Sequence, residues 1–532
     1  MHVQDALPML ADPEPRAAER VAASIGLLTE AAPAFTPAAR VPYAGLLLAL
    51  PALEATGLLG CVHEVYGCLK PGFYGLNTVI LETVLRTLTG EPRAEGATRL
   101  DPVGFGRILG MDRAPDVKTV RRKHQELAGE GKTGELLEAL GRHHLATRDT
   151  AGEDGLGLLL YVDGHVRSYQ GTKKIAKQYS TRLKHPVAAS METWVADADG
   201  SPVFMVMAEP SSSLVGELRR LTPTLRQMIG DDRRVLIGFD REGWSPQLFH
   251  DLSQAGFDPL TWRKGEAEEV DAKLFSKHTY TDIWGRDHTY DKVADTTLTL
   301  EYGPKGKETR FQMRQISRIV AAGKQVREAT GQDTRQIHIL TSNTTLEAAE
   351  VAYRMSARWR HENYFRYARQ HFALDAHDSY QGVLDDEQRS VPNPAKAKAK
   401  AKRDALAAKL TTLVAAVDAQ ELALSTPEPG ETMLITNQML NDLNAPVIKV
   451  EKELAQADEV YQSIPGRLPL GEVNPGQQVL ESEMKQLLHG FRMAAYNASM
   501  ILATEVRTNT GFKAAVTQAH AFVRQVFSRS IR

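Results

Sequence analysis

The chain has 532 residues, which at ~150 residues per domain corresponds to roughly three or four domains. Its 42% apolar and 24% charged residues are typical of an ordinary soluble protein that can bury a large core. The net charge of −2 excludes a uniformly basic protein, so any surface for a polyanion must be local.

The cysteines and the apolar runs exclude two classes of protein. Cys61 and Cys68 flank His63 in "CVHEVYGC", but a second ligand pair at metal-site spacing is missing, so we expect reduced thiols rather than a metal site. The start of the chain is acidic and Pro-rich, without a secretory pattern. The run "YAGLLLALPALEATGLLG" is interrupted by Pro51 and Glu54 and is too short to span a bilayer. We expect a cytoplasmic protein with no membrane partner.

Residues 1–150 are expected to form a helical domain, because apolar residues recur there at helical spacing. Within it, "DPVGFGRILGMDRAPDVKTVRRKHQELAGEG" predicts a short helix, a turn at Gly110 and a second helix starting near Pro115. The second helix is crowded with basic residues: Lys118, Arg121, Arg122 and Lys123. This pattern is typical of a DNA-binding helix-turn-helix, and the alternative is a solvated charged helix.

From residue 151 the pattern changes to that of a mixed α/β domain. Apolar runs predict strands in "GLLLYVDGHV", on both sides of "DADGSP", in "RRVLIGFD" and in "FDPLTW". Helices are predicted in "SSSLVGELRRLTPTLRQMIG", with serines available as N-caps, and in "SPQLFHDLSQAG". We assign residues 151–265 and 335–378 to this core domain.

Two further regions are predicted around this core. Residues 266–334 are rich in Thr, Tyr and alternating patterns, which favour an antiparallel β insertion. Residues 379–532 are predicted to be a helical C-terminal region, punctuated by Pro and Gly over 424–475 and ending in a strongly helical tail. The lysines of "AKAKAKAKR" spread around their helix, which favours a solvated surface over a DNA-binding arm.

Two carboxylates are predicted to meet at the edge of the core sheet. Asp163 and Asp240 each end an apolar strand and are followed by a break, Gly164 in one case and "REG" in the other. Functional sites of open α/β sheets collect at such strand ends. Paired carboxylates repel each other unless a cation neutralises them, and hard oxygen ligands favour Mg²⁺ or Mn²⁺.

A third carboxylate is predicted on the long helix of "TTLEAAEVAYRMSARWRHENYFRYARQ". Glu362 shares one helix face with Arg358 and Arg369, at spacings of four and seven residues. Surface ion pairing alone would explain such a cluster.

Three stretches resemble the DDE-type transposases of bacterial insertion sequences, in the branch with a β insertion before the final glutamate: "YVDGH", "GFDREGWSP" followed by "LTWRKG", and "RWRHENYFRYARQ". That branch carries Tyr, Arg, Glu and Lys, in this order, on its last helix, with two, three and six other residues between successive members. Arg358 and Glu362 match the Arg and Glu, Arg369 stands at the Lys position, and Met355 replaces the Tyr.

The resemblance, which covers roughly residues 155–375, implies a ribonuclease H-like core that binds double-stranded DNA. Asp163, Asp240 and Glu362 would hold two Mg²⁺ or Mn²⁺ ions, and the enzyme would cleave transposon ends and join them to target DNA. Arg358 and Arg369 would contact phosphates. Since transposition joins two ends, the resemblance also implies a homodimer on DNA, with the C-terminal helices as the contact.

A basic run after Asp163 contains no acid and suits a DNA backbone, although a solvated hairpin would look the same. Its residues are Arg167, Lys173, Lys174, Lys177, Arg182 and Lys184. In the β insertion, Trp284 is a candidate for stacking on an extruded base, with plain sheet packing as the alternative. Glu242, two residues past Asp240, is a rival metal ligand.

Two other functions stay open at this point. One is a domesticated or decayed relative that binds DNA without cutting it, which the departures at positions 355 and 369 leave open. The other is a ribonuclease H-like nuclease that cuts DNA but never joins it.

Overall fold

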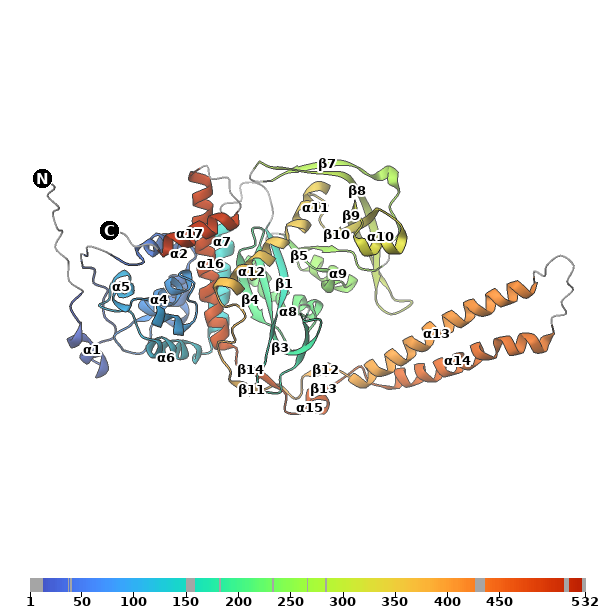
Figure 1. Cartoon of the computed structure of the whole chain (residues 1–532), viewed down its shortest axis with the longest axis horizontal. Helices are drawn as coiled ribbons and strands as arrows, with labels where there is room; N and C mark the ends of the chain where they lie inside the picture. Colours follow the sequence, from blue (N-terminus) through green and yellow to red (C-terminus); the bar gives the residue numbers. More distant parts are fainter. Residues whose placement is uncertain are drawn as a thin grey trace. The chain divides into compact units, whose positions relative to one another are not determined.

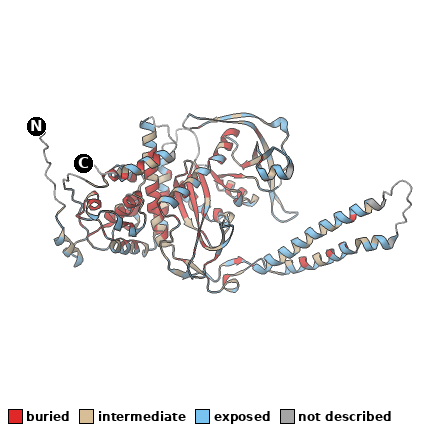
Figure 2. Cartoon of the chain, viewed as in Figure 1, coloured by how far each residue is buried: buried red, intermediate tan, exposed pale blue. Residues whose placement is uncertain are grey.

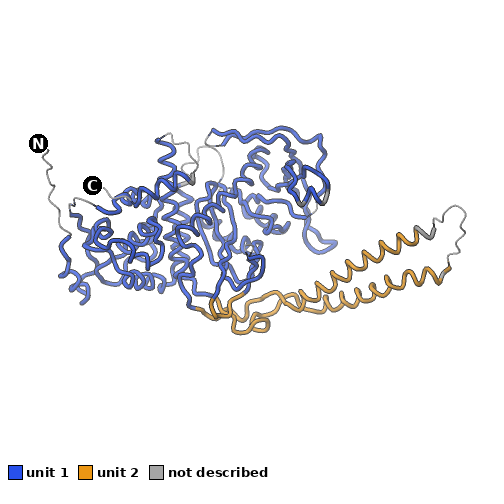
Figure 3. Tube along the Cα trace, in the orientation of Figure 1, with its two compact units in different colours: residues 1–170, 177–381, 480–532 blue, residues 171–176, 382–479 orange. Residues whose placement is uncertain are grey.

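The computed structural model describes residues 13–36, 38, 41–149, 158–180, 183–231, 234–265, 267–282, 285–425, 436–510 and 516–528. The chain divides into two compact units, drawn in different colours in Figure 3. Unit 1 takes residues 1–170, 177–381 and 480–532, and unit 2 takes residues 171–176 and 382–479. The expected C-terminal region starting at residue 379 is therefore split, because its last helices belong to unit 1.

No single helix in the described part of the chain is long and apolar enough to cross a bilayer. One pair, Ala44–Ala55 with Leu58–Tyr66, passes by length and composition but is bent by 61°.

The N-terminal part of unit 1 is helical in the described residues. It contains α1 (Ala17–Ser24), η1 (Ala44–Leu48), α2 (Ala49–Ala55), α3 (Leu58–Tyr66), α4 (Leu76–Leu88), η2 (Ala94–Arg99), α5 (Pro102–Ile108), α6 (Val117–Ala128) and α7 (Thr133–Asp149). The helical tail forms α16 (Glu483–Asn509) and α17 (Val516–Phe527). Helix α16 packs against α2, α4, α6 and α7, and Leu487 and Phe491 on it are fully buried (Figures 1 and 2). The end of the chain thus completes the core of its beginning.

A large mixed sheet forms the centre of unit 1 (Figure 1). Its strands follow the order β2-β3-β1-β5-β6-β10-β9-β8-β7, with β4 paired to β3. Strands β1, β5 and β6 are mutually parallel, and the other pairings are antiparallel. The strands are β1 (Leu159–Ser168), β2 (Lys177–Ser180), β3 (His185–Asp197), β4 (Pro202–Met207), β5 (Val235–Phe239), β6 (Phe257–Trp262), β7 (Ser276–Thr281), β8 (Asp287–Tyr302), β9 (Thr309–Ala321) and β10 (Thr334–Thr341).

The predicted core helices are present between these strands. Helix α8 (Leu214–Ile229) joins β4 to β5, and Ser213 caps it by accepting a hydrogen bond from the N–H of Gly216 (3.2 Å). Helix α9 (Pro246–Gln254) joins β5 to β6 and is capped by Ser245 in the same way. Strands β7, β8 and β9 form an antiparallel ribbon, which is followed by α10 (Lys324–Thr330).

Two local predictions in the core are wrong. Asp163 was expected to end its strand, but β1 continues to Ser168 because β3 pairs with it along its whole length and Gly164 does not break that ladder. The single long helix expected near Glu362 is instead two helices, α11 (Ala348–Ala357) and α12 (Trp359–His371), which meet at Arg358.

Unit 2 is built on two long helices, α13 (Pro394–Ser425) and α14 (Asn437–Ser463), that pack against each other (Figure 1). Most of their surface is exposed, as Figure 2 shows. Helix α14 continues through Pro446 and buries Val447 and Val450, within the stretch that is punctuated by Pro and Gly. The short strands β11 (Gly382–Leu384), β12 (Ser390–Pro392), β13 (Arg467–Pro469) and β14 (Gln478–Leu480) and the helix α15 (Leu470–Val473) accompany them.

Candidate active site

The sheet register brings Asp163 and Asp240 together. The parallel pairing of β1 with β5 ends at Val162 and Phe239, so the next residue on each strand is one of the two aspartates. Beyond this point β1 pairs only with β3, and the β5 side of the sheet opens. A cavity of about 1070 Å³ lies there and is lined by the carboxylates of Asp163, Glu217, Asp240, Glu242, Glu362 and Asp375. All three predicted acidic residues therefore line one cavity.

Asp163 has a partner on each carboxylate oxygen. Its Oδ1 accepts a hydrogen bond from the N–H of Gly164 (2.8 Å), and its Oδ2 accepts one from Nη1 of Arg358 (3.1 Å). Burial raises the pKa of Asp163 to about 6, and the negative charges of Asp240 and Glu362 act in the same direction. Arg358 and the Gly164 N–H oppose this rise without cancelling it.

Asp240 is fixed by the turn that follows β5. It precedes the 3₁₀ turn η3 (Arg241–Gly243), and its Oδ1 accepts a hydrogen bond from the N–H of Arg241 (2.6 Å). The rival residue Glu242 lies in this turn, is exposed and also lines the cavity.

Glu362 enters the cavity from the first turn of α12. Its Oε1 accepts a hydrogen bond from Nη2 of Arg358 (2.9 Å), and its side chain is 55% exposed. Arg358 thus bridges Asp163 and Glu362 with two nitrogens of one guanidinium, while its own side chain is only 15% exposed. The position of the family tyrosine holds Met355, which is buried in the core against the sheet.

The chemistry of these donors fits a hard divalent cation, since three carboxylates line one cavity and their repulsion contributes to the raised pKa of Asp163. Their present arrangement is not yet that of a metal site. Across the described ranges, no three His, Cys, Asp or Glu side chains gather closely enough to hold an ion. The side chain that lies between Asp163 and Glu362 is Arg358.

Basic side chains surround this acidic cavity. Arg369 on α12 is exposed and lines it, as the sequence suggested. Lys264 also lines it and was missed by the sequence analysis. Its signal was its place two residues beyond β6, the strand next to β5.

The predicted basic run after Asp163 divides into four groups. Lys177 on β2 and Lys184 before β3 are exposed in unit 1. Lys173 and Lys174 belong to unit 2, where Lys174 donates a hydrogen bond to the carbonyl of Pro475 (2.6 Å). Arg182 lies outside the described residues, as does Trp284.

Arg167, the remaining member of the run, corrects the prediction of a DNA contact. It is only 3% exposed, and its guanidinium forms an ion pair with Glu192 and donates to Ser190 Oγ (2.7 Å). Arg167 lies on the same side of β1 as Asp163, because alternate residues of a strand share a side. It also lines the cavity, but its guanidinium is held by Glu192 and Ser190.

The candidate DNA-binding helix is α6. Lys118, Arg121 and Arg122 are exposed on it, and Arg121 forms an ion pair with Glu95. The fourth basic residue, Lys123, is buried and donates to the carbonyl of Lys70 (3.0 Å).

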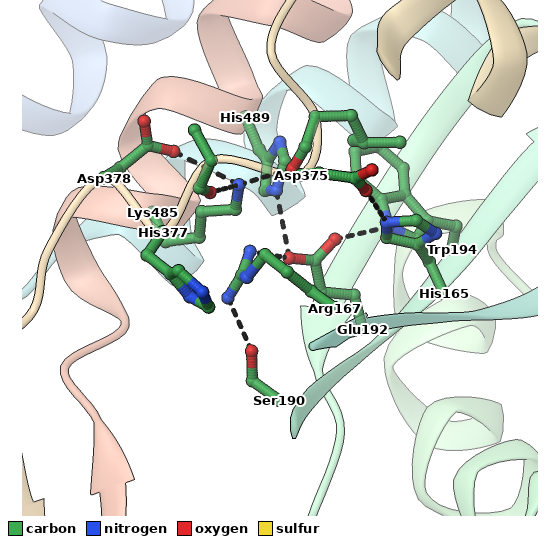
Figure 4. A network of polar contacts seen from close by, with 12 residues as sticks. His165, Arg167, Ser190, Glu192, Trp194, Asp375, His377, Asp378, Lys485 and His489 are labelled. Atoms are coloured by element: carbon green, nitrogen blue, oxygen red, sulfur yellow. Dashed lines mark hydrogen bonds and ion pairs between the residues drawn. The ribbon is translucent and has the colours of Figure 1, made fainter. Parts of the chain in front are cut away.

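Next to the cavity lies a buried network of charges that the sequence did not reveal (Figure 4). Glu192 on β3 receives hydrogen bonds from Trp194 (3.1 Å) and His489 (3.2 Å) in addition to Arg167. Asp378, in the loop after α12, pairs with Lys485 (3.2 Å) on α16. Burial opposes ionisation of Glu192, but His489, Arg167 and Lys485 outweigh it and hold its pKa well below the ordinary value.

His165 connects the cavity wall to this region. It lies two residues beyond Asp163 on β1, and its Nε2 is 2.9 Å from Oδ1 of Asp375 (Figure 4). Its ring stacks on Phe365 of α12, with centroids 5.4 Å apart. His165 therefore packs the helix that carries Glu362 against the strand that carries Asp163.

An open α/β sheet with a carboxylate-lined cavity at the ends of its parallel strands has the layout of an enzyme site. Over residues 14–531 the chain matches a family described as "Transposase protein", and it belongs to that family. Comparison with curated proteins finds no match. Among solved structures, a piggyBac transposase synaptic complex with hairpin DNA is similar at 9% identity and a TM-score of 0.31, over 92% of this chain and 87% of that chain. That likeness is too weak to bear on the fold or the site.

Proposed function

We propose that the protein is a DDE transposase that cleaves DNA at transposon ends and joins these ends to target DNA. One observation carries the proposal: Asp163, Asp240 and Glu362 come from three distant segments and line one cavity. Membership of a transposase family supplies the class of reaction. The three carboxylates would hold two Mg²⁺ or Mn²⁺ ions.

The strand order supports a ribonuclease H-like core. Strands β4, β3 and β1 form an antiparallel meander, and β5 and β6 extend it in parallel through the helical crossovers α8 and α9. The ribbon of β7, β8 and β9 lies in the chain between this core and α12, as expected for the branch with a β insertion.

The roles of the side chains follow from their positions. Divalent ions bound to the carboxylates would activate the attacking oxygen and stabilise the leaving oxygen of a phosphodiester. Arg369 and Lys264 stand on the cavity wall, where they would orient phosphates by charge. Arg358 is the cation in contact with two of the carboxylates. The exposed Lys118, Arg121, Arg122, Lys177 and Lys184 would bind the DNA backbone.

The partner we propose is double-stranded DNA, bound by two copies of the chain in the bacterial cytoplasm. Two DNA ends must meet for transposition, so each protomer would hold one end. The mostly exposed α13–α14 hairpin is the segment available for contact between protomers.

The test starts from the inverted repeats that should flank the reading frame. DNA carrying these ends is incubated with the protein and Mg²⁺, and nicked and joined products are separated on a gel. Asp163→Asn should lower cleavage by about three orders of magnitude or more while leaving DNA binding intact. Glu242→Gln, a change on the same cavity wall, is the matched control and should cut normally.

Three outcomes would overturn parts of this proposal. Equal cleavage by Asp163→Asn and the unchanged protein would show that the carboxylate set is wrong. Binding of the ends without any cleavage by the unchanged protein would favour a domesticated DNA-binding relative. Cleavage without joined products would favour a nuclease.

A further inference from the structure

Arg358 contacts two of the three carboxylates that are proposed as metal ligands. Its Nη1 lies 3.1 Å from Asp163 Oδ2, and its Nη2 lies 2.9 Å from Glu362 Oε1. One planar guanidinium therefore binds two acidic side chains that come from different elements, β1 and α12. Without a cation between them these carboxylates would repel each other.

The contacts of Asp163 make Arg358 a competitor for any incoming ion. Oδ1 of Asp163 already accepts from the Gly164 N–H, and Oδ2 accepts from Arg358. Oε1 of Glu362 likewise accepts a hydrogen bond from Arg358. A divalent ion that binds Oδ2 of Asp163 and Oε1 of Glu362 must therefore first break both hydrogen bonds of Arg358.

The place of Arg358 in the chain suits a side chain that can be exchanged. It stands at the junction between α11 and α12, where the helix is interrupted. Its neighbour Trp359 is 55% exposed, so little packing surrounds the junction on that side. The long Arg side chain can leave the carboxylates by rotating its own bonds, without moving either helix.

We propose that Arg358 is a resident counter-cation that closes the acidic site in the free protein and is displaced when the first divalent ion binds. This rests on the proposed function, because it assumes that Asp163 and Glu362 are metal ligands. The displaced guanidinium is then free to meet a phosphate of the DNA. The site would therefore exchange one cation for another as it becomes active.

The experiment measures Mn²⁺ binding to the full-length protein without DNA, by isothermal titration calorimetry and by the electron paramagnetic resonance signal of free Mn²⁺. Arg358→Gln removes the competing cation, so Mn²⁺ should bind at least about fivefold more tightly. Arg369→Gln removes the same charge from the same cavity without touching Asp163 or Glu362, and should change the affinity less than twofold. Arg358→Lys keeps the positive charge but loses the planar guanidinium that reaches both carboxylates. Its Mn²⁺ affinity should lie between those of the other two variants.

The outcomes separate this inference from the proposed function. If Asp163→Asn binds Mn²⁺ as well as the unchanged protein does, the metal site itself is wrong. If Asp163→Asn loses binding but neither Arg358→Gln nor Arg358→Lys tightens it, the metal site stands and the exchange is wrong. Equal tightening by Arg358→Gln and Arg369→Gln would also overturn the exchange, because general charge would then explain the effect. If Arg358→Gln does not fold, the Arg358→Lys comparison decides.

Discussion

Strand β1 contributes to two groups of charges that lie close together and differ in character. Asp163 faces the cavity, where acidic side chains outnumber their cationic contacts. Four residues further along, Arg167 enters the buried network with Glu192, which His489 and Trp194 complete. In the cavity burial raises the pKa of Asp163 to about 6, whereas in the network the pKa of Glu192 is held well below its ordinary value.

This difference teaches which charges stabilise the fold. The carboxylates of the buried network receive hydrogen bonds from cations and ring N–H groups, so their ionised form is favoured in the folded protein. The ionised form of Asp163 is disfavoured there, even with Arg358 beside it. A carboxylate whose ionised form is disfavoured by the fold lowers the stability of the protein, and such groups are common at active sites.

Breaking the buried network should produce the largest effect. Asp378→Asn keeps the size of the side chain and suits the left-handed backbone at this position (φ 62°), but leaves Lys485 and Arg492 without their countercharge. We expect a loss of about 3–5 kcal/mol in the free energy of unfolding, measured by urea denaturation. Glu301→Gln, in an exposed pair with Arg310, should change it by about 0.5 kcal/mol or less.

The stability loss of Asp378→Asn should also depend on pH. The pKa of Asp378 is lowered in the folded protein: burial acts against this, but Arg492 and Lys485 outweigh it. Its stabilising contribution is therefore complete above the unfolded pKa of about 3.9 and is lost as the pH falls through the folded pKa. The deficit of Asp378→Asn should narrow as the pH falls below about 4. A deficit that is the same at pH 3 would contradict this origin.

Removing the charge of Asp163 should raise the free energy of unfolding instead of lowering it. The pKa of Asp163 is higher in the folded protein than in the unfolded chain. Its contribution to the free energy of unfolding is therefore most favourable below the unfolded pKa and is lost as the pH rises through about 6. Asp163→Asn lacks this loss and should be more stable than the unchanged protein by roughly 1–3 kcal/mol at pH 8, in buffer containing EDTA. The gain should shrink between pH 6 and pH 4. Lower stability of Asp163→Asn at pH 8 would show that the Arg358 contact outweighs burial.

The smallest effect on stability is expected from the exposed charges of α6. Changing Lys118, Arg121 and Arg122 to Gln should alter the free energy of unfolding by about 0.5 kcal/mol or less per residue, since all three are exposed. If they contact phosphates, the salt dependence of DNA binding should lose roughly three units of slope. A matched triple change on α13 should leave the slope unchanged: Lys398, Lys402 and Lys409, all to Gln. Equal slopes for both triple variants would exclude α6 as a DNA contact.

Local patterns predicted most of the core correctly. From β1 to β6, apolar strands alternate with amphipathic helices. Each segment shows in its own residue pattern which side is buried against the sheet, so it can be predicted without its neighbours. Asp163 and Asp240 were predicted to meet, and each directly follows the last residue pair between β1 and β5. The helices before residue 150 and the antiparallel strands β7, β8 and β9 lie in segments whose local patterns are of the same kind.

The errors occur where the outcome depends on a distant partner. Gly164 resembles a strand break, but the ladder with β3 carries β1 four residues further. Arg167 resembles a surface cation, and only its pairing with Glu192 explains its burial. Neither of these partners can be read from a single local window.

The path of the chain around unit 2 has a consequence for the evolution of the protein. The N–H of Glu481 donates to the carbonyl of Gln381 (2.9 Å), so the chain leaves unit 1 and returns to it at adjacent points. The residues near Gln478 also bind the connection between β1 and β2, because the N–H of Gln478 donates to the carbonyl of Lys174 (2.9 Å). In their described residues the long helices α13 and α14 make no such contact, so relatives of this chain should differ in length mainly within residues 394–463.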